Sequence, residues 1–375
     1  MSEWPMVRLG DVAEVVSGGT PKTSVSEYWD GDIPWVTPKD ISSNKNLWIS
    51  SGSRSITEFG LAKSGAILLP SKAVLWSSRA PIGLVAIASN PIATNQGFKS
   101  FIPGNELDSC YLAHFLIYNQ AVLQNLGVGA TFKEVSAKRA AEIQIPLPPL
   151  EEQKRIADIL NEIDRSIRDI NHEIELVGDL SIFQWKTGGE NQYLSDLIDI
   201  RSGSVDPTLS ENRHLPLIAP DSIEKGTGML LKVESCEQAG VVSGKHHFYE
   251  GDVLYSKIRP YLNKVIVASC EGLCSSDIYV LKTKSNFTPE VIQALLMSKS
   301  FLEYVERESS GTSIPRIGRK KFLMYKTPKL SDLQVFELTK KIQKVNEFRL
   351  LLAQKFILFQ ELQRSLSARA FAGLL

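Results

Sequence analysis

The chain has 375 residues, with 42 basic and 42 acidic side chains, 43% apolar residues and 22% charged residues. This balance excludes a wholly disordered or collagen-like chain, and the length predicts two or three domains. The sequence shows no run of about 18 apolar residues and no apolar leader after Met1, so we expect a cytoplasmic protein. Four cysteines are too few for a disulfide framework. The zero net charge argues against indiscriminate coating of nucleic acid.

The first 150 residues contain short apolar runs separated by turns. Ala66–Leu69, Ala73–Trp76 and Leu84–Ile87 have the composition of strands, and Cys110–Leu126 has that of a helix. Few helices among many short strands indicate an α+β domain with a twisted sheet.

A long helix is predicted next, over residues 151–186. Its apolar residues recur in alternating steps of four and three, which is the heptad seam of a paired helix. Glu151 and Glu152 occupy the first turn, where carboxylates complement the helix dipole, and Thr187-Gly188-Gly189 is the expected exit. The seam consists of Ile156, Leu160, Ile163, Ile167, Ile170, Ile174 and Val177.

The rest of the chain repeats this plan. Leu9, Asp11, Ser17 and Gly18 correspond to Leu194, Asp196, Ser202 and Gly203, at an offset of 185. Val74–Ser77 corresponds to Val253–Ser256 at an offset of 179, and Thr94–Phe98 lies opposite Ser275–Tyr279 at 181. The constant order of such matches indicates a duplication.

Between the matches the two copies differ, and residues 43–65 share almost nothing with 224–247. Two similar modules that read different targets would leave this pattern, and so would relaxed loops on a repeated fold. The second copy has strand-like runs at Val253–Tyr255, Lys264–Val267 and Ile278–Leu281, and a predicted helix at Pro289–Arg307.

A second long helix is predicted over residues 331–375, and Ser331 and Gln334 have the spacing of a capping box at its start. Arg349 and Gln363 interrupt its apolar seam, while Phe348, Leu351, Leu358 and Leu362 widen the apolar face, so this helix can contact more than one neighbour. The seam consists of Leu338, Ile342, Val345, Leu352, Phe356, Phe359 and Leu366. Residues 151–185 carry a net charge of −5 and residues 331–375 one of +3, which favours pairing of the two helices.

No convincing catalytic constellation is present in the sequence. The five histidines (114, 172, 214, 246 and 247) lack the spacing of a metal site, and no dinucleotide or P-loop signature occurs. Cys270 and Cys274 form one CxxxC pair without a second, so zinc is not expected. We therefore expect a non-catalytic chain that holds neither a metal nor another cofactor.

Polar and basic residues gather in turns of both copies, where they could contact DNA. Arg and Lys suit phosphates and guanine edges, Asn and Gln suit adenine edges, and Ser and Thr suit either backbone or base. The candidates in the first copy are Thr20, Lys22, Thr23, Ser78, Arg79, Asn95, Gln96, Lys99, Thr131 and Lys133. Those in the second copy are Lys257, Arg259, Lys264, Ser276, Ser313, Arg316, Arg319 and Lys320. Residues 1–150 carry 12 basic and 12 acidic side chains, so partner subunits would have to supply much of the phosphate contact.

With the repeat established, the chain resembles the specificity (S) subunits of type I restriction-modification systems over nearly its whole length. The most specific segment is Ile143–Ile156, IQIPLPPLEEQKRI, which is similar to the family's junction between recognition domain and conserved helix. The other similar segments are Trp4–Gly18, Val74–Gly83, Ala93–Ser100, Gly251–Lys264 and Ala368–Leu375. The second junction, Lys326–Gln334, has one proline instead of two and lacks Glu-Glu-Gln.

The resemblance implies target recognition domains at 1–150 and 187–330, and conserved spacer helices at 151–186 and 331–375. These helices would run antiparallel as a coiled coil between the domains, in a pseudo-two-fold repeat. It also implies double-stranded DNA, two methyltransferase subunits and restriction-translocase subunits as partners. S-adenosylmethionine, ATP and magnesium would then be needed only in the partner subunits.

Two alternatives of other classes remain open at this point. A scaffold that holds two protein-binding modules apart without touching DNA would fit the neutral charge. The other is an enzyme with an unrecognised site, such as a nuclease, which metal-dependent cleavage by the isolated chain would reveal.

Overall fold

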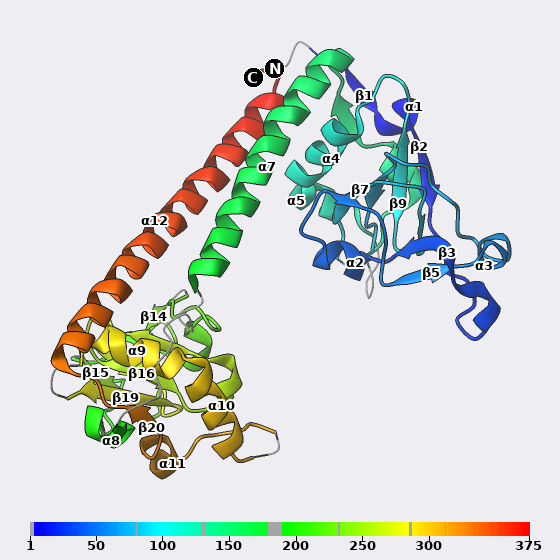
Figure 1. The fold of residues 1–375 in the computed structure, drawn as a ribbon. Coiled ribbons are helices and arrows are strands. Elements are labelled where there is room, and N and C mark those ends of the chain that lie inside the picture. Colours follow the sequence, from blue (N-terminus) through cyan, green and yellow to red (C-terminus); the bar gives the residue numbers. More distant parts are fainter. Residues whose placement is uncertain are drawn as a thin grey trace. The chain divides into compact units, whose positions relative to one another are not determined.

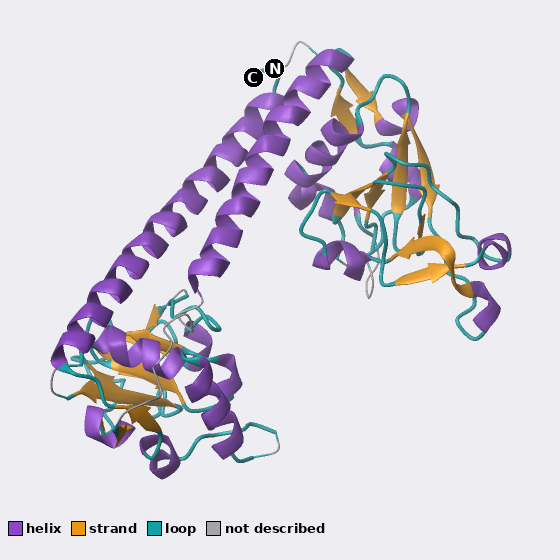
Figure 2. Cartoon of the chain, viewed as in Figure 1, coloured by secondary structure: helices purple, strands orange, loops and turns teal. Residues whose placement is uncertain are grey.

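The computed structural model describes residues 4–79, 81–128, 133–178, 190–231, 233–284, 287–311 and 313–375. The chain divides into two compact units. Unit 1 comprises Met1–Ile170 and Lys355–Leu375, and unit 2 comprises Asn171–Gln354. Each unit has a body of short strands and short helices, and each includes part of both long helices (Figures 1 and 2). The expected α+β class is confirmed.

The strands of unit 1 form a five-stranded sheet of order β2-β9-β6-β7-β4, a three-stranded sheet of order β5-β3-β8, and the pair β1-β10. The strands are β1 (Met6–Arg8), β2 (Ala13–Ser17), β3 (Trp29–Val36), β4 (Trp48–Ile49), β5 (Arg54–Ile56), β6 (Val74–Trp76), β7 (Val85–Ala88), β8 (Ala93–Thr94), β9 (Lys99–Pro103) and β10 (Gln144–Pro146). The helices are α1 (Leu9–Val12), α2 (Pro38–Ser43), α3 (Glu58–Ala62), α4 (Ser109–Tyr118), α5 (Gln120–Leu123), α6 (Ala137–Ala141) and the long α7 (Leu150–Gly178).

The strands of unit 2 form two four-stranded sheets, of order β12-β19-β16-β17 and β14-β13-β18-β15, and the pair β11-β20. The strands are β11 (Asn191–Tyr193), β12 (Ile198–Ile200), β13 (Pro216–Ile218), β14 (Glu234–Ser235), β15 (His246–Phe248), β16 (Val253–Ser256), β17 (Val265–Val267), β18 (Gly272–Cys274), β19 (Ile278–Thr283) and β20 (Lys326–Pro328). The helices are α8 (Leu194–Leu197), α9 (Pro289–Met297), α10 (Lys299–Glu308), α11 (Arg319–Leu323) and the long α12 (Asp332–Phe371).

The internal repeat is confirmed by the sheets. The order β2-β9-β6-β7 in unit 1 recurs as β12-β19-β16-β17 in unit 2. The antiparallel pair β1-β10 recurs as β11-β20, and the parallel pair β3-β8 recurs as β13-β18. The divergent segments adopt different structures, because residues 43–65 hold β4, β5 and α3 whereas residues 224–247 hold β14 and the start of β15. A shared frame therefore carries two unlike inserts.

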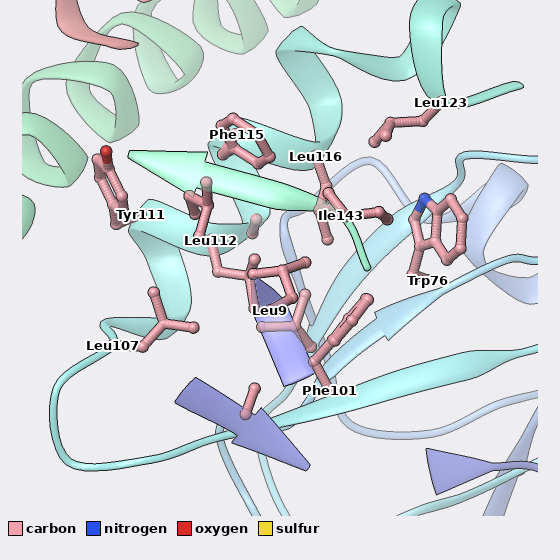
Figure 3. Close-up of a cluster of buried hydrophobic side chains, with 14 of the residues drawn as sticks. Leu9, Trp76, Phe101, Leu107, Tyr111, Leu112, Phe115, Leu116, Leu123 and Ile143 are labelled. Carbon is pink, nitrogen blue, oxygen red and sulfur yellow. The ribbon is translucent and has the colours of Figure 1, made fainter. Parts of the chain in front are cut away.

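The core of unit 1 lies between the five-stranded sheet and α4. Trp76 of β6 and Phe101 of β9 are fully buried, with ring centroids 6.2 Å apart, and they pack near Leu9 and Ile143 (Figure 3). Figure 3 also shows Tyr111, Leu112, Phe115 and Leu116 of α4 closing the same cluster. One face of the sheet is thus covered by α4, whose residues Tyr111–Leu116 are all buried.

Three predicted elements differ from the structure. The segment Ala66–Leu69 is no strand, and only Leu69 pairs there, in a single-residue bridge with Ile92. The predicted helix Cys110–Leu126 is interrupted at Asn119, and Pro289–Arg307 is interrupted at Ser298. Ser298 has an extended backbone, and its side chain caps α10 by accepting a hydrogen bond from the Phe301 amide. Apolar periodicity continued through both breaks and concealed them.

In unit 1 the two long helices run in opposite directions. Arg155, near the start of α7, donates to the carbonyl of Leu375, and Gln363 of α12 donates to the Asp164 carboxylate further along α7. Residue numbers therefore decrease along α12 in the direction in which they increase along α7 (Figure 1). Near the end of α12, Phe371 packs against Tyr111, Phe115 and Tyr118 of α4, with ring centroids 5.4 to 5.5 Å apart.

The predicted seam positions lie on the covered faces of the two helices. Ile156, Leu160, Ile163 and Ile170 of α7 are buried, while Ile167, Ile174 and Val177 are half-buried. On α12, Ile342 and Leu352 are buried, and Leu338, Val345, Phe356, Phe359 and Leu366 are half-buried. The predicted exit of the first helix, Thr187-Gly188-Gly189, lies outside the described residues.

The first turns of each long helix pack on the globular body that precedes them. Ile156 and Leu160 join the cluster built on α4, while Leu338 and Ile342 pack with Val291 and Ala294 of α9. The seam therefore attaches each helix to its own body as well as serving helix pairing. At 1.5 Å per residue, the 29 residues of α7 and the 40 of α12 extend about 44 and about 60 Å.

Candidate nucleic-acid interface

The polar candidates of unit 1 converge on the turn between β8 and β9. The Asn95 side chain accepts a hydrogen bond from the Gly97 amide (2.9 Å), and the Gly97 carbonyl accepts bonds from the amide and hydroxyl of Ser78 (2.7 and 3.2 Å). The Ser78 carbonyl in turn accepts from the Val135 amide (2.9 Å). Three segments far apart in the sequence are therefore held together by their backbones.

A carboxylate that the sequence did not single out lies among these candidates. Glu134 forms ion pairs with Arg79 (Nε–Oε2, 2.9 Å) and with Lys99 (Nζ–Oε1, 3.3 Å). Partial burial would raise the pKa of Glu134, but hydrogen bonds from the two cations outweigh it and hold that pKa below its usual value. Lys99 is almost fully buried, whereas Arg79 remains exposed. Of the two cations, Arg79 is therefore the one accessible to a ligand.

The glycine turn before Thr20 serves packing rather than ligand binding. A Cβ on Gly18 would come within 2.0 Å of the Asn95 carbonyl oxygen, and one on Gly19 within 2.2 Å of the Gly65 carbonyl carbon. This close approach allows Thr20 to hydrogen-bond to Gln96, which brings both candidates to the same turn. Lys22 and Thr23 are exposed further along, as is Lys133, while Thr131 lies outside the described residues.

The candidates of unit 2 form a corresponding cluster. The Lys257 amide donates to the Asp277 carbonyl (2.9 Å), and the Lys257 carbonyl accepts from the Ile317 amide (3.0 Å). The Arg316 guanidinium lies 3.6 Å from the Asp277 carboxylate, as measured from Nη2 to Oδ1. Lys257 also places its ammonium 5.3 Å from the centre of the Tyr279 ring. The backbone of Lys257 and the side chain of Arg316 therefore both contact Asp277.

Arg259 and Lys264 border a small pocket beside this cluster. The pocket has a volume of about 270 Å³ and is lined by Pro220, Asp221, Ser256, Ile258, Arg259, Leu262, Lys264 and Asp277. Arg259 adopts a left-handed backbone (φ 45°) and is exposed. Lys264 donates to the Pro220 carbonyl (2.6 Å), so its ammonium is already engaged by the protein.

The remaining candidates of unit 2 are exposed but belong to several segments. Ser276 lies beside Asp277, while Ser313 precedes Arg316 on the same loop. Arg319 donates to the Ile200 carbonyl (3.2 Å), and Lys320 follows it in α11. Lys257, Ser276 and Arg316 thus lie around Asp277. Arg319 and Lys320 of α11 belong to a separate segment.

Equivalent backbone bonds define the register between the two clusters. The bond from the Ser78 amide to the Gly97 carbonyl recurs from Lys257 to Asp277, and that from Phe98 to Asn95 recurs from Ile278 to Ser275. These pairs give an offset of 180 for the turn, so the expected offset of 181 is wrong by one residue. Gly97, not Gln96, is therefore the counterpart of Asp277. Val135 and Ile317 make equivalent bonds to Ser78 and Lys257 at an offset of 182, so Glu134 stands where the second copy has Arg316.

The described residues offer neither a metal site nor a membrane-spanning helix. Within the described ranges, no group of three or more His, Cys, Asp or Glu side chains is placed to hold a metal ion. Of the helices that the structure describes, none is both long and apolar enough to span a membrane.

Comparison with known proteins confirms the resemblance that the residues suggested. A family model described as "Type I restriction modification DNA specificity domain" matches residues 1–176. The MjaIX specificity subunit of Methanocaldococcus jannaschii is 33% identical over 255 residues, which cover 60% of this chain and 59% of that protein. The EcoR124I/EcoR124II specificity subunit of Escherichia coli is 28% identical over 188 residues, covering 46% and 45%. The chain thus matches less than two thirds of the length of these relatives.

Solved structures confirm the fold over the whole chain. A chain from a study of complex assembly and conformational transition in the type I R-M system has a TM-score of 0.57 at 19% identity, covering 99% of this chain and 98% of the other. The S subunit of a type I restriction-modification system from M. genitalium has a TM-score of 0.53 at 15% identity, covering 100% and 96%.

Proposed function

We propose that this chain, which carries a type I specificity domain in residues 1–176 and has the fold of specificity subunits, directs a type I complex to its DNA target. In this proposal the chain performs no catalysis and holds no cofactor of its own. Two methyltransferase subunits bring S-adenosylmethionine, and restriction-translocase subunits bring ATP and magnesium. The complex acts in the cytoplasm, where its double-stranded DNA target lies.

The observation that carries the proposal is a repeated frame with unlike inserts. Both units share the order of four strands in one sheet and equivalent backbone bonds around the polar cluster, while residues 43–65 and 224–247 differ in structure. Two copies of one recognition unit suit a DNA duplex, because the two strands of the duplex are themselves related by a two-fold axis. Because the inserts differ, we propose that each unit reads its own half-site and that the target is bipartite and asymmetric.

We propose that the long helices set the gap between the half-sites. Their lengths of about 44 and about 60 Å correspond to between one and two turns of DNA, at about 34 Å per turn. Removal of one heptad, Ile163–Asp169, keeps the phase of the apolar seam while it shortens α7. The expected result is an altered gap or lost activity, with both half-sites unchanged. Arg165→Ala, at an exposed position of the same heptad and without a change of length, is the control.

We further propose that exposed apolar side chains of α12 bind the methyltransferase subunits. In unit 1 these are Ile357, Leu358 and Leu362, and in unit 2 they include Phe348 and Leu351. Clusters of large exposed apolar residues on one helix are typical of protein-interaction surfaces. Because residues 1–150 carry no net charge, we propose that the methyltransferase subunits also supply contacts to the DNA phosphates.

Methylation mapping tests this function directly. DNA from a host that carries the chain with its methyltransferase subunit should be methylated at one asymmetric motif with a fixed unread gap. A continuous methylated motif would contradict the proposal.

The same exposed apolar residues also suit a scaffold that binds proteins without DNA. Co-purification with the methyltransferase subunit, followed by a mobility shift of duplex DNA at moderate salt, separates the two functions. Failure of that complex to shift any duplex would favour the scaffold.

A further inference from the structure

The two polar clusters share one backbone feature, a residue that forms two single-residue bridges. In unit 1 this residue is Glu134, which bridges to Arg79 and to Val128. In unit 2 it is Arg316, which bridges to Ile258 and to Ser310. Glu134 and Arg316 are counterparts at an offset of 182, because Val135 and Ile317, the residues that follow them, make the same bond to Ser78 and Lys257.

The arginine and the carboxylate at this bridge stand at different positions in the two units. In unit 1 the carboxylate stands on the bridging residue, and its arginine stands across the bridge at position 79. In unit 2 the arginine stands on the bridging residue itself, and its carboxylate, Asp277, occupies the position that is Gly97 in unit 1. Each unit therefore keeps one arginine beside one carboxylate, but presents the arginine from the opposite side of the bridge.

The fold does not account for this arrangement. The frame at the bridge is held by backbone hydrogen bonds that are the same in both units. Both arginines are about half exposed, with 46% of the Arg79 side chain and 55% of the Arg316 side chain accessible, and exposed ion pairs contribute little to stability. An arginine–carboxylate pair that both units keep, although different positions supply it, fits a role in binding better than a role in folding.

We propose that Arg79 and Arg316 each read a guanine edge, one in each half-site, and that Glu134 and Asp277 hold them in position. This inference rests on the proposed function and assigns it to particular side chains. A guanidinium donates in parallel to O6 and N7 of guanine, which is the commonest specific contact of an arginine in the major groove. A neighbouring carboxylate restricts the rotamers of the arginine and so reduces the entropy lost on binding.

The contacts leave suitable donors for the base. Arg79 meets Glu134 through Nε, so its two terminal nitrogens can face a guanine. Arg316 lies nearest to Asp277 through Nη2 (3.6 Å), which has two N–H groups, so the one not facing Asp277 can still donate in parallel with its neighbouring nitrogen. Lys99 balances the remaining charge of Glu134 from a nearly buried position. Because the two arginines stand on opposite sides of the bridge, the guanines should occupy different positions in the two half-sites.

The test uses the full chain in complex with its methyltransferase subunit and a library of duplexes randomised in both half-sites. Arg79→Ala should lower the preference for guanine at one position of one half-site by about 5- to 150-fold and leave the other half-site unchanged. Arg316→Ala should do the same in the other half-site. Arg79→Lys keeps the charge but loses the parallel donors, so it should also relax that position.

Glu134→Gln and Asp277→Asn test the positioning role. Each should weaken the preference for the same guanine as its arginine, by a smaller factor and without affecting other positions. Arg8→Ala is the matched control, because Arg8 forms an exposed ion pair with Asp11 away from the bridge and should change no position. Thermal melting of every variant checks that it folds, and Arg79→Lys and Glu134→Gln serve if the alanine variants do not.

Two results would overturn the inference while leaving the proposed function intact. One is an unchanged motif with a folded Arg79→Ala variant. The other is uniform weakening across all sequences with a reduced dependence on salt, which would identify Arg79 as a phosphate contact. A library that shows no bipartite motif with the unmodified complex would instead contradict the proposed function itself.

Discussion

The imidazole of His114 on α4 lies with its Nε2 2.9 Å from the side-chain oxygen of Asn161 on α7. Its Nδ1 lies 3.8 Å from the carboxylate of Asp164, which also accepts a hydrogen bond from Gln363 of α12. His114 is 5% exposed. Within unit 1 a buried polar group thus joins the body to both long helices.

This buried histidine predicts a dependence of stability on pH. Burial lowers the pKa of His114, and the opposing attraction of Asp164 is the smaller effect. Below a pH of about 6.5 the unfolded chain takes up a proton that the folded chain resists, so the free energy of unfolding falls as pH falls, by up to about 1.4 kcal/mol per pH unit. Urea unfolding between about pH 7.5 and 5.5 should show a steeper fall for the unmodified chain than for His114→Gln. His172→Gln, at an exposed position, should keep the original slope.

The buried hydrogen bonds of Gln153 predict that its substitution lowers the free energy of unfolding. It is fully buried at the start of α7, accepts from the Asp108 amide (2.8 Å), and donates to the carbonyls of Glu106 and Pro148 (2.8 and 2.9 Å). Gln153→Leu would leave these backbone groups without partners and should lower the free energy of unfolding by at least about 2 kcal/mol. Glu151→Gln, at the exposed position two residues earlier, should change it by less than about 0.5 kcal/mol. Equal losses in denaturant unfolding would contradict this role.

The glycine turn predicts a contrast between two neighbouring substitutions. Gly19→Ala would press its Cβ against the backbone of Gly65 and Ala66. It should therefore lower the free energy of unfolding by about 1–3 kcal/mol. Gly65→Ala, whose Cβ would meet nothing within 4 Å, should have little effect. Chemical denaturation of both variants measures the difference. A stable Gly19→Ala variant would show that the two segments can separate without loss.

The apolar face of α12 predicts a loss of binding without a loss of stability. Leu358 and Leu362 are 63% and 45% exposed, one turn apart on one helix face. The double change Leu358→Gln with Leu362→Gln should alter the free energy of unfolding by about 0.5 kcal/mol or less, yet reduce co-purification with the methyltransferase subunit. Glu361→Gln, on the exposed side of the same turn, is the control. Undiminished co-purification would place the methyltransferase contact elsewhere.

Local sequence pattern was enough to predict the long helices and the repeated sheets of this protein. The apolar seams from Ile156 and from Leu338 predicted both long helices and their covered faces, because burial of a helix face recurs with the period of the helix itself. The capping box predicted at Ser331 and Gln334 is present, with the Ser331 amide 2.9 Å from Oε1 of Gln334. The ordered matches between the two halves likewise predicted the repeated sheets, because each match marks the same turn or strand.

Only the tertiary structure decided which distant side chains meet. Nothing in the order of residues indicates that Glu134 lies between Arg79 and Lys99, or that Asp277 takes the place of Gly97. Such contacts depend on the register of strands, and a shift of one residue exchanges the side chains that meet. The breaks at Asn119 and Ser298 escaped the prediction because the apolar period continued across them, although both residues make local side-chain bonds there. A sequence records the period of burial within each segment, whereas contacts between segments arise only when the segments fold together.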